Sequence, residues 1–197
     1  MEQRARLTDK QERRRRASDH IEHGAVTEGY RGDRKKVIEL LNEALATEIV
    51  CVLRYKRHYF MSVGIHGESV AAEFLQHAIE EQGHADELAM RITQLGGEPN
   101  LDPAGLLDRS HSEYVEGKNL AQMIREDLVA ERVAIDAYAD AVRFVGDDDP
   151  TTRRMLEGIL ATEEEHADDL AKLLATWERS GPEVFVSRPS ATGAPSH

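Results

Sequence analysis

The sequence predicts an all-α protein built from four long helices. Hydrophobic residues make up 40% of the chain, charged residues 31% and aromatic residues only 5%. This composition, rich in Ala, Leu, Glu and Arg, favours helix over sheet. Long segments also repeat apolar residues at steps of three and four, which is the period of an amphipathic helix. Four such segments, two short turns and one long link predict a bundle of two helical hairpins joined by a long crossover.

The first hairpin is predicted from apolar periodicity and from the breaks that interrupt it. Its first helix begins after Asp33 and ends near Met61, where the short break SVGIHG at residues 62–67 follows. Its second helix runs from about Ser69 to Leu95. The pair Gly96–Gly97 then stops the helix, because glycine is the usual residue just beyond a helix C-terminus.

The second hairpin carries clear capping signals. Asn119 is a suitable N-cap for a third helix that reaches Val145. Asp149 and Pro150 are suited to the N-cap and first position of a fourth helix, which should end near Arg179.

The remaining segments divide the chain into an arm, a bundle and a tail. Residues 1–33 alternate charged and small residues and predict a charged arm that is flexible or weakly helical. Residues 34–179 form the predicted bundle, and residues 180–197 predict an extended tail. Within the bundle, residues 96–118 link the two hairpins, with one helical turn expected at residues 103–109.

Charge and cysteine content exclude several classes of protein. Lys and Arg total 25 and Asp and Glu total 37, a net charge of −12, and an acidic protein attracts cations and repels nucleic acid. Cys51 is the only cysteine, which excludes an intramolecular disulfide and a rubredoxin-like iron site within the chain. No segment approaches the ~20 apolar residues of a membrane helix, and the N-terminus lacks the apolar core of a secretory signal. A cytoplasmic protein is expected.

The second and fourth predicted helices carry the same motif. Residues 81–89 read EQGHADELA and residues 163–171 read EEEHADDLA, so both match E-x-x-H-A-D-x-L-A. A glutamate, Glu48 or Glu131, precedes each motif by 33 or 32 residues, and a tyrosine follows that glutamate by seven residues. Seven residues make two turns, so each tyrosine shares the helix face of its glutamate. The two halves therefore look like a duplication about a pseudo-twofold axis.

The repeated residues predict a metal site at the centre of the bundle. Residues at i and i+3 share one helix face, and antiparallel helices of equal length bring their midpoints together. Four unpaired carboxylates in an apolar core would repel one another strongly, whereas two divalent cations would balance their charge. Carboxylates with some imidazole suit iron or manganese, as in di-iron and di-manganese bundles. The predicted ligands are Glu48, Glu81, His84, Glu131, Glu163 and His166.

Residues 80–86, together with the turn at residues 95–100, resemble the second helix and following turn of bacterioferritins and their mini-ferritin (Dps-like) relatives. The resemblance covers about residues 34–178 and implies a ferritin-like ferroxidase that oxidises ferrous iron with O2 or H2O2 and stores the product in a cage. It also implies a role for each ligand: Glu48 with His84 at one iron ion, Glu131 with His166 at the other, and Glu81 and Glu163 as bridges. Tyr55 matches a family tyrosine that supplies an electron or a hydrogen bond, and is the predicted catalytic residue.

Three departures from that family shape the prediction. Gln82 stands where bacterioferritins carry the methionine that binds haem between subunits, so haem is not expected. Residues 181–186 look extended and no fifth helix follows, and the link between the hairpins is long. Both features favour a cage of 12 subunits, with a 24-subunit cage as the alternative.

Other functions stay open at this point. The same bundle could serve a di-iron or di-manganese peroxidase, catalase or oxygenase. The run Arg13–Arg16 could bind DNA phosphates, as the basic arms of some mini-ferritins do, although the acidic residues around it make this the less favoured reading. His77 and Glu80 could pass iron inward, but a solvent-facing polar pair is the preferred interpretation. For Cys51, the preferred role is that of a small buried hydrophobe.

Overall fold

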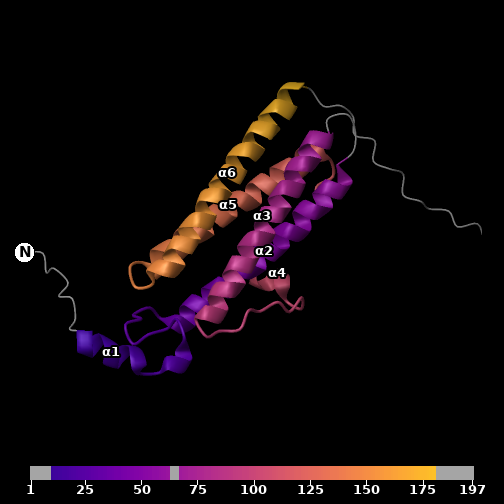
Figure 1. Ribbon diagram of the computed structural model, residues 1–197. Helices are drawn as coiled ribbons and strands as arrows, with labels where there is room; N and C mark the ends of the chain where they lie inside the picture. Colours follow the sequence, from indigo (N-terminus) through magenta and orange to yellow (C-terminus); the bar gives the residue numbers. More distant parts are fainter. Residues whose placement is uncertain (1–9, 63–66, 181–197) are drawn as a thin grey trace, which may run out of the picture.

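Four long helices form a bundle of two antiparallel hairpins in the computed structural model, which describes residues 10–62 and 67–180. They are α2 (Arg34–Met61), α3 (Gly67–Gln94), α5 (Leu120–Val145) and α6 (Pro150–Ser180). The hairpins α2–α3 and α5–α6 lie side by side (Figure 1), joined by contacts of α2 with α5 and of α3 with α6. Throughout the described ranges, every regular element is a helix, so the predicted all-α bundle is confirmed.

N-cap side chains define where three of the helices begin. Asp33 Oδ1 accepts a hydrogen bond from the backbone N–H of Lys36 at 3.3 Å, and Asn119 Oδ1 accepts one from Gln122 at 3.0 Å. Asp149 Oδ1 accepts from the Thr152 N–H at 2.9 Å. Each bond satisfies one of the N–H groups that a helix start leaves without a partner. The helix starts predicted at these positions are confirmed.

A buried ion pair fixes the link between the hairpins, which contains the four-residue helix α4 (Leu106–Arg109). On α2, Arg54 donates through Nε to Asp127 Oδ1 of α5 at 2.8 Å, and through Nη1 to the carbonyl oxygen of Glu113 in the link, also at 2.8 Å. His58 Nδ1 lies 2.7 Å from Asp127 Oδ2. Because loss of one partner would leave a buried charge unpaired, at a cost of about 3–5 kcal/mol, this network holds the link against α2 and α5.

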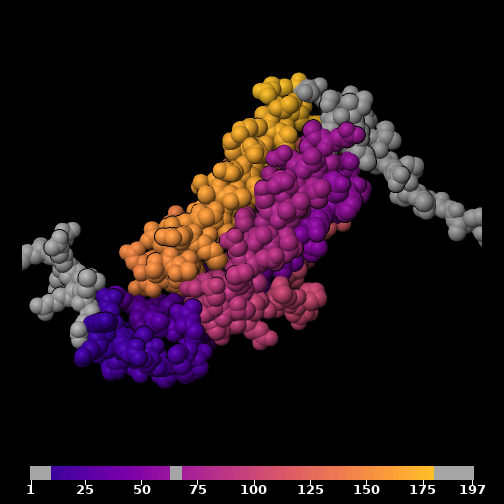
Figure 2. Space-filling view, viewed as in Figure 1, coloured from indigo at the N-terminus to yellow at the C-terminus, as the bar shows by residue number. Residues whose placement is uncertain are grey.

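The segment before α2 folds back over one end of the bundle. It contains α1 (Lys10–Ser18) and a short 3-10 turn (Ile21–His23), drawn in indigo in Figures 1 and 2. Val26 and Tyr30 pack against the hydrophobic core, and the Tyr30 hydroxyl donates to Asp149 Oδ2 at 3.1 Å. Residues 26–30 therefore belong to the packed body of the protein, although the sequence predicted a charged arm there.

A polar layer separates two hydrophobic clusters along the bundle. One cluster includes Leu45 of α2 and the other includes Cys51 of the same helix, with the buried Glu48 between them. The other three long helices repeat this order, with apolar residues on both sides of a buried acidic or histidine position. The layer thus lies at the middle of the bundle, with packed apolar side chains at either end.

Some predictions fall outside the described residues. They concern residues 1–9 of the arm, residues 63–66 of the turn after α2, and the tail from residue 181 onward, including the absence of a fifth helix. Among the helices that are described, none combines the length and apolarity needed to cross a membrane.

Candidate metal centre

Four glutamates from four different helices meet in the polar layer. Glu48 comes from α2, Glu81 from α3, Glu131 from α5 and Glu163 from α6, and each is at most 1% exposed. Ionised carboxylates are almost never buried so deeply without a partner, because the loss of hydration is costly. The layer therefore requires cations or protons to balance its charge.

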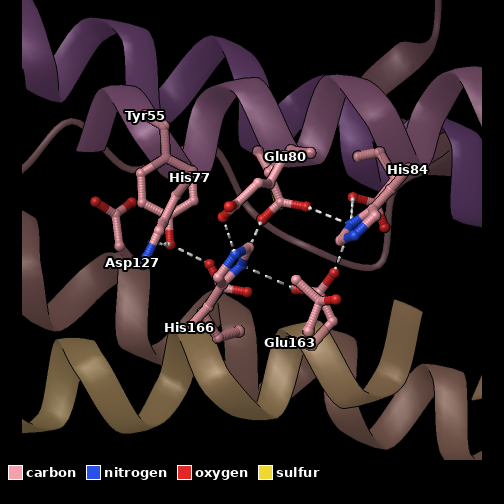
Figure 3. A network of polar contacts seen from close by, with 12 residues as sticks. Tyr55, His77, Glu80, His84, Asp127, Glu163 and His166 are labelled. Atoms are coloured by element: carbon pink, nitrogen blue, oxygen red, sulfur yellow. Dashed lines mark hydrogen bonds and ion pairs between the residues drawn. The ribbon is translucent and has the colours of Figure 1, made fainter. Parts of the chain in front are cut away.

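Two histidines point into the same cluster of carboxylates (Figure 3). His84 Nδ1 lies 2.9 Å from Glu163 Oε1, 3.2 Å from Glu81 Oε2 and 3.6 Å from Glu48 Oε2. His166 Nδ1 lies 3.5 Å from Glu81 Oε1 and 3.8 Å from Glu163 Oε2. We call these two histidines and the four glutamates the central site. The structure thus brings together all six residues that the sequence singled out.

The central site divides into two overlapping groups of potential ligands. Within each group, one oxygen or nitrogen atom per residue lies within 4.8 Å of all the others. Glu81 and Glu163 belong to both groups, and we call them the shared glutamates. One group adds Glu48 and His84, and the other adds Glu131 and His166. Two cations side by side, with the shared glutamates between them, fit this geometry.

Several of these ligand atoms have no hydrogen-bond partner. Glu81 Oε1, Glu131 Oε2, His166 Nδ1 and both carboxylate oxygens of Glu163 are buried without one. Buried polar atoms in proteins are nearly always hydrogen-bonded, so a cluster of exceptions needs an explanation. Because these atoms all belong to the central site and are all good metal ligands, the residues present fit a pair of hard divalent cations.

Two buried tyrosines hold the outer glutamates of the central site. The Tyr55 hydroxyl of α2 donates to Glu131 Oε1 of α5, and the Tyr138 hydroxyl of α5 donates to Glu48 Oε1 of α2. The two contacts cross between the helices and follow the pseudo-twofold symmetry of the sequence repeat. Tyr138 is therefore the structural counterpart of Tyr55, as the sequence repeat indicates, although the family resemblance implies a role for Tyr55 alone.

Burial raises the pKa values of two of the four glutamates and so favours their protonated form. Burial, reinforced by repulsion from Glu81, raises the pKa of Glu48 to about 8. Burial and repulsion from the shared glutamates raise the pKa of Glu131 well above its usual range. Burial would also raise the pKa of each shared glutamate, but the neighbouring His84 and His166 help to lower both values. These shifts favour the ionised form of the shared glutamates and the protonated form of Glu48 and Glu131.

Both histidines of the central site are protonated before metal binds. Burial alone would lower their pKa values, but the surrounding carboxylates outweigh it and raise the pKa of His84 to about 12 and that of His166 to about 10. Two imidazolium ions then balance two ionised carboxylates. Protons on the glutamates and histidines thus balance the charge of the metal-free layer. Once these protons have left, two divalent cations would balance the four carboxylates.

Glu80 and His77 lie beside the central site on α3. Glu80 Oε2 is 2.7 Å from His166 Nε2, so it orients the ring with Nδ1 facing the shared glutamates, as carboxylates commonly do behind metal-binding histidines. His77 is only 2% exposed, and its ring stacks on that of His166 with 4.0 Å between centroids. The interpretation of His77 as solvent-facing was wrong, because the rotation of α3 turns it toward α6.

The structure also shows the surroundings of Cys51 and Gln82, two other residues that the sequence analysis discussed. Cys51 is buried, as predicted, and burial raises the pKa of its thiol well above the usual range. Gln82, at the position of the haem-binding methionine in bacterioferritins, is exposed and donates to Asp86 Oδ1 at 3.0 Å.

The arginine run of the N-terminal segment forms ion pairs with its own acidic neighbours. Arg15 lies 2.8 Å from Glu12 and 3.2 Å from Asp19, and Arg16 lies 3.5 Å from Glu28. Acidic groups beside a basic run reduce its attraction for phosphate. DNA binding by this segment is therefore not supported by its charge arrangement.

Comparison with known proteins identifies the family of this chain. The family model for the ferritin-like domain matches residues 38–180. The bacterioferritin of Rhodobacter capsulatus is 30% identical over 155 residues, which cover 77% of this chain and 90% of that protein.

Two solved structures agree with this match. One is the bacterioferritin-related protein of Bacteroides fragilis, described as a dodecameric thioferritin. It has a TM-score of 0.73 and 32% identity over 76% of this chain and 90% of that one. The other is the bacterioferritin of Desulfovibrio desulfuricans, solved with its diiron site in different catalytic states. It has a TM-score of 0.65 and 27% identity over 74% of this chain and 82% of that one. The chain belongs to the ferritin family and is a relative of the bacterioferritins.

Proposed function

We propose that the protein is a ferroxidase that oxidises ferrous iron and stores the ferric product. The observation that carries this proposal is the pair of overlapping ligand groups, which offers places for two cations with the shared glutamates between them. Two ferrous ions bound together supply two electrons, which together with two protons reduce O2 to H2O2 or H2O2 to two molecules of water. Iron is the proposed metal, and manganese is the alternative that the same ligands would accept.

The residues of the central site have distinct tasks in this proposal. The shared glutamates bind between the two ions, while Glu48 with His84 and Glu131 with His166 each complete one side. Glu48, Glu131 and both histidines must release their protons before they bind. The Tyr55 hydroxyl donates to Glu131 and holds this ligand in place, and Tyr55 is the proposed catalytic residue. Haem has no part in the proposal, because the side chain of Gln82 is a poor iron ligand.

Storage requires an assembly. Both ends of the bundle are filled by packed hydrophobic clusters, and close-packed interiors leave no room for a mineral. Soluble homo-oligomers usually close with point-group symmetry, and the related Bacteroides fragilis protein is dodecameric. These points support a 12-subunit cage that attracts ferrous iron through the net charge of −12.

We expect light scattering after size exclusion to give a mass about twelve times the 22.1 kDa of the chain. After aerobic loading with ferrous iron, the iron should elute with this species. A 24-subunit cage that retains iron would contradict the expected size while leaving storage standing. A stable dimer that retains no iron would contradict storage.

One observation favours a second candidate, an oxygenase that uses the same metals. A groove of about 320 Å³ between α2 and α5 is lined mainly by apolar side chains. Tyr138 lines this groove and also contacts Glu48 of the central site. A small apolar substrate could therefore bind close to the metals, as such an enzyme requires. Substrate-dependent O2 consumption by a protein that retains no iron would favour this candidate.

A further inference from the structure

A second group of metal-ligand side chains lies outside the central site, between α3 and α6. It consists of Glu73 and His77 of α3 and Asp169 of α6, and we call it the outer cluster. One ligand atom from each residue lies within 4.8 Å of the other two. Glu73 and His77 are one helical turn apart, and Glu73 Oε1 lies 3.3 Å from His77 Nε2. Two carboxylates and one imidazole form a common ligand set for divalent transition-metal ions.

His77 distinguishes the outer cluster from an ordinary acidic surface. Its side chain is 2% exposed, whereas that of Glu73 is 34% exposed, so the imidazole lies beneath carboxylates that reach the surface. His77 Nδ1 lies 3.1 Å from the Tyr55 hydroxyl, which leaves Nε2 to face Glu73. Histidines that bind metals are oriented in this way, with one ring nitrogen held by a hydrogen bond and the other turned to the ligand position.

A lysine already contacts part of the outer cluster. Lys172 Nζ lies 3.1 Å from Asp169 Oδ1 and 2.5 Å from Asp168 Oδ2. The lysine side chain is 65% exposed, and exposed ion pairs of this kind contribute little to stability. A divalent cation can therefore displace Lys172 from Asp169, since Asp168 still offers it a partner.

The outer cluster is in contact with the central site. The ring of His77 stacks on that of His166, and Glu80 Oε2 lies 2.7 Å from His166 Nε2. His77, Glu80 and His166 also form a group whose ligand atoms lie within 4.8 Å of one another. Figure 3 shows Glu80 and His77 on the α3 side of His166. Ligand atoms thus continue from the partly exposed Glu73 to His166 without an apolar gap.

We propose that Glu73, His77 and Asp169 form a third divalent-cation site, which binds ferrous iron at the surface and passes it by way of Glu80 to the central site. Binding of a cation at the outer cluster does not depend on the proposed function. The delivery of iron to the central site does rest on it. The two parts can be separated by measuring cation binding with an ion that O2 does not readily oxidise at this site.

Binding is tested with Co2+ by equilibrium dialysis of the assembled protein in excess Mg2+, followed by metal analysis. The parent should bind about three Co2+ per chain, one at the outer cluster and two at the central site. The variant Glu73→Gln/Asp169→Asn should bind about two. The control Glu87→Gln/Glu164→Gln removes the same charge from exposed positions of α3 and α6, and should bind about three. Equal binding by the parent and the Glu73→Gln/Asp169→Asn variant would overturn the proposal, as would an equal loss in the control.

A variant of the shared glutamates separates the two sites. Glu81→Gln/Glu163→Gln should still bind about one Co2+ per chain, and adding Glu73→Gln/Asp169→Asn should remove it. If only the outer cluster binds Co2+, the proposed function fails and the third site stands. If all Co2+ is lost with the shared glutamates, the third site fails and the proposed function stands.

Delivery of iron is tested by its effect on kinetics. In Glu73→Gln/Asp169→Asn, ferrous oxidation at low iron concentration should slow about tenfold. The rate at saturating iron should match that of the parent, because the central site is unchanged. An unchanged rate at low iron concentration would overturn the delivery role, and so would an equal slowing in Glu87→Gln/Glu164→Gln.

Discussion

Replacing both shared glutamates, in the variant Glu81→Gln/Glu163→Gln, should slow the rapid oxidation of ferrous iron by at least about a hundredfold. Each of these residues belongs to both ligand groups, so the double change weakens both metal positions at once. Residues that merely orient a ligand already change affinity by about 10- to 100-fold, and a lost ligand should exceed that. Stopped-flow absorbance of the ferric product measures the rate.

The control Glu87→Gln/Glu164→Gln removes the same charge from exposed positions of the same helices and should oxidise iron at the parent rate. Circular dichroism should show equal helix content in both variants. A cation stabilises a protein only by binding its native state, so Co2+ should raise the melting temperature of the control more than that of Glu81→Gln/Glu163→Gln. Parent-like oxidation by Glu81→Gln/Glu163→Gln would refute the assignment of the shared glutamates.

Metal binding to the central site should release about four protons per pair of ions near neutral pH. Glu48 and Glu131 have raised pKa values and hold protons in the metal-free protein, as do His84 and His166. Each must give up one proton to become a ligand. Because the metal-free protein binds more protons, metal affinity should rise with pH, and the rise should become less steep above about pH 8, where Glu48 loses its proton without metal.

Calorimetric titration with Co2+ in buffers of different ionisation enthalpy measures this release directly. The Glu73→Gln/Asp169→Asn background restricts the titration to the central site. Between pH 6 and 7 the affinity for each ion should rise by roughly a hundredfold, since about two protons leave per ion. Release of no more than one proton per pair of ions would contradict the protonation pattern inferred from burial.

The helix starts and the central site could be predicted because their signals are local or repeated. Asp33, Asn119 and Asp149 are N-caps whose side chains bond to backbone groups three residues away, so neighbouring residues define them. The two E-x-x-H motifs fix their own ligands on one helix face. Four helices of similar length then bring the matching positions together. Predicting this meeting point needs no knowledge of detailed packing.

Contacts that depend on how the helices rotate about their axes could not be predicted. His77 was expected to face solvent together with Glu80, yet the setting of α3 against α6 buries it. Arg54 and Asp127 pair across 73 residues, and no periodicity of either helix marks them as partners. Tyr138 is different. The sequence repeat already pairs it with Tyr55, so its contact could have been predicted from symmetry alone.

The most direct test of the account is a crystal structure of the protein soaked anaerobically in ferrous iron, with anomalous data collected on both sides of the iron absorption edge. We predict two iron peaks between the four helices, about 3.5–4 Å apart, each beside one histidine of the central site and with Glu81 and Glu163 between them. Anomalous density confined to surface carboxylates, with none among the six residues of the central site, would contradict the account.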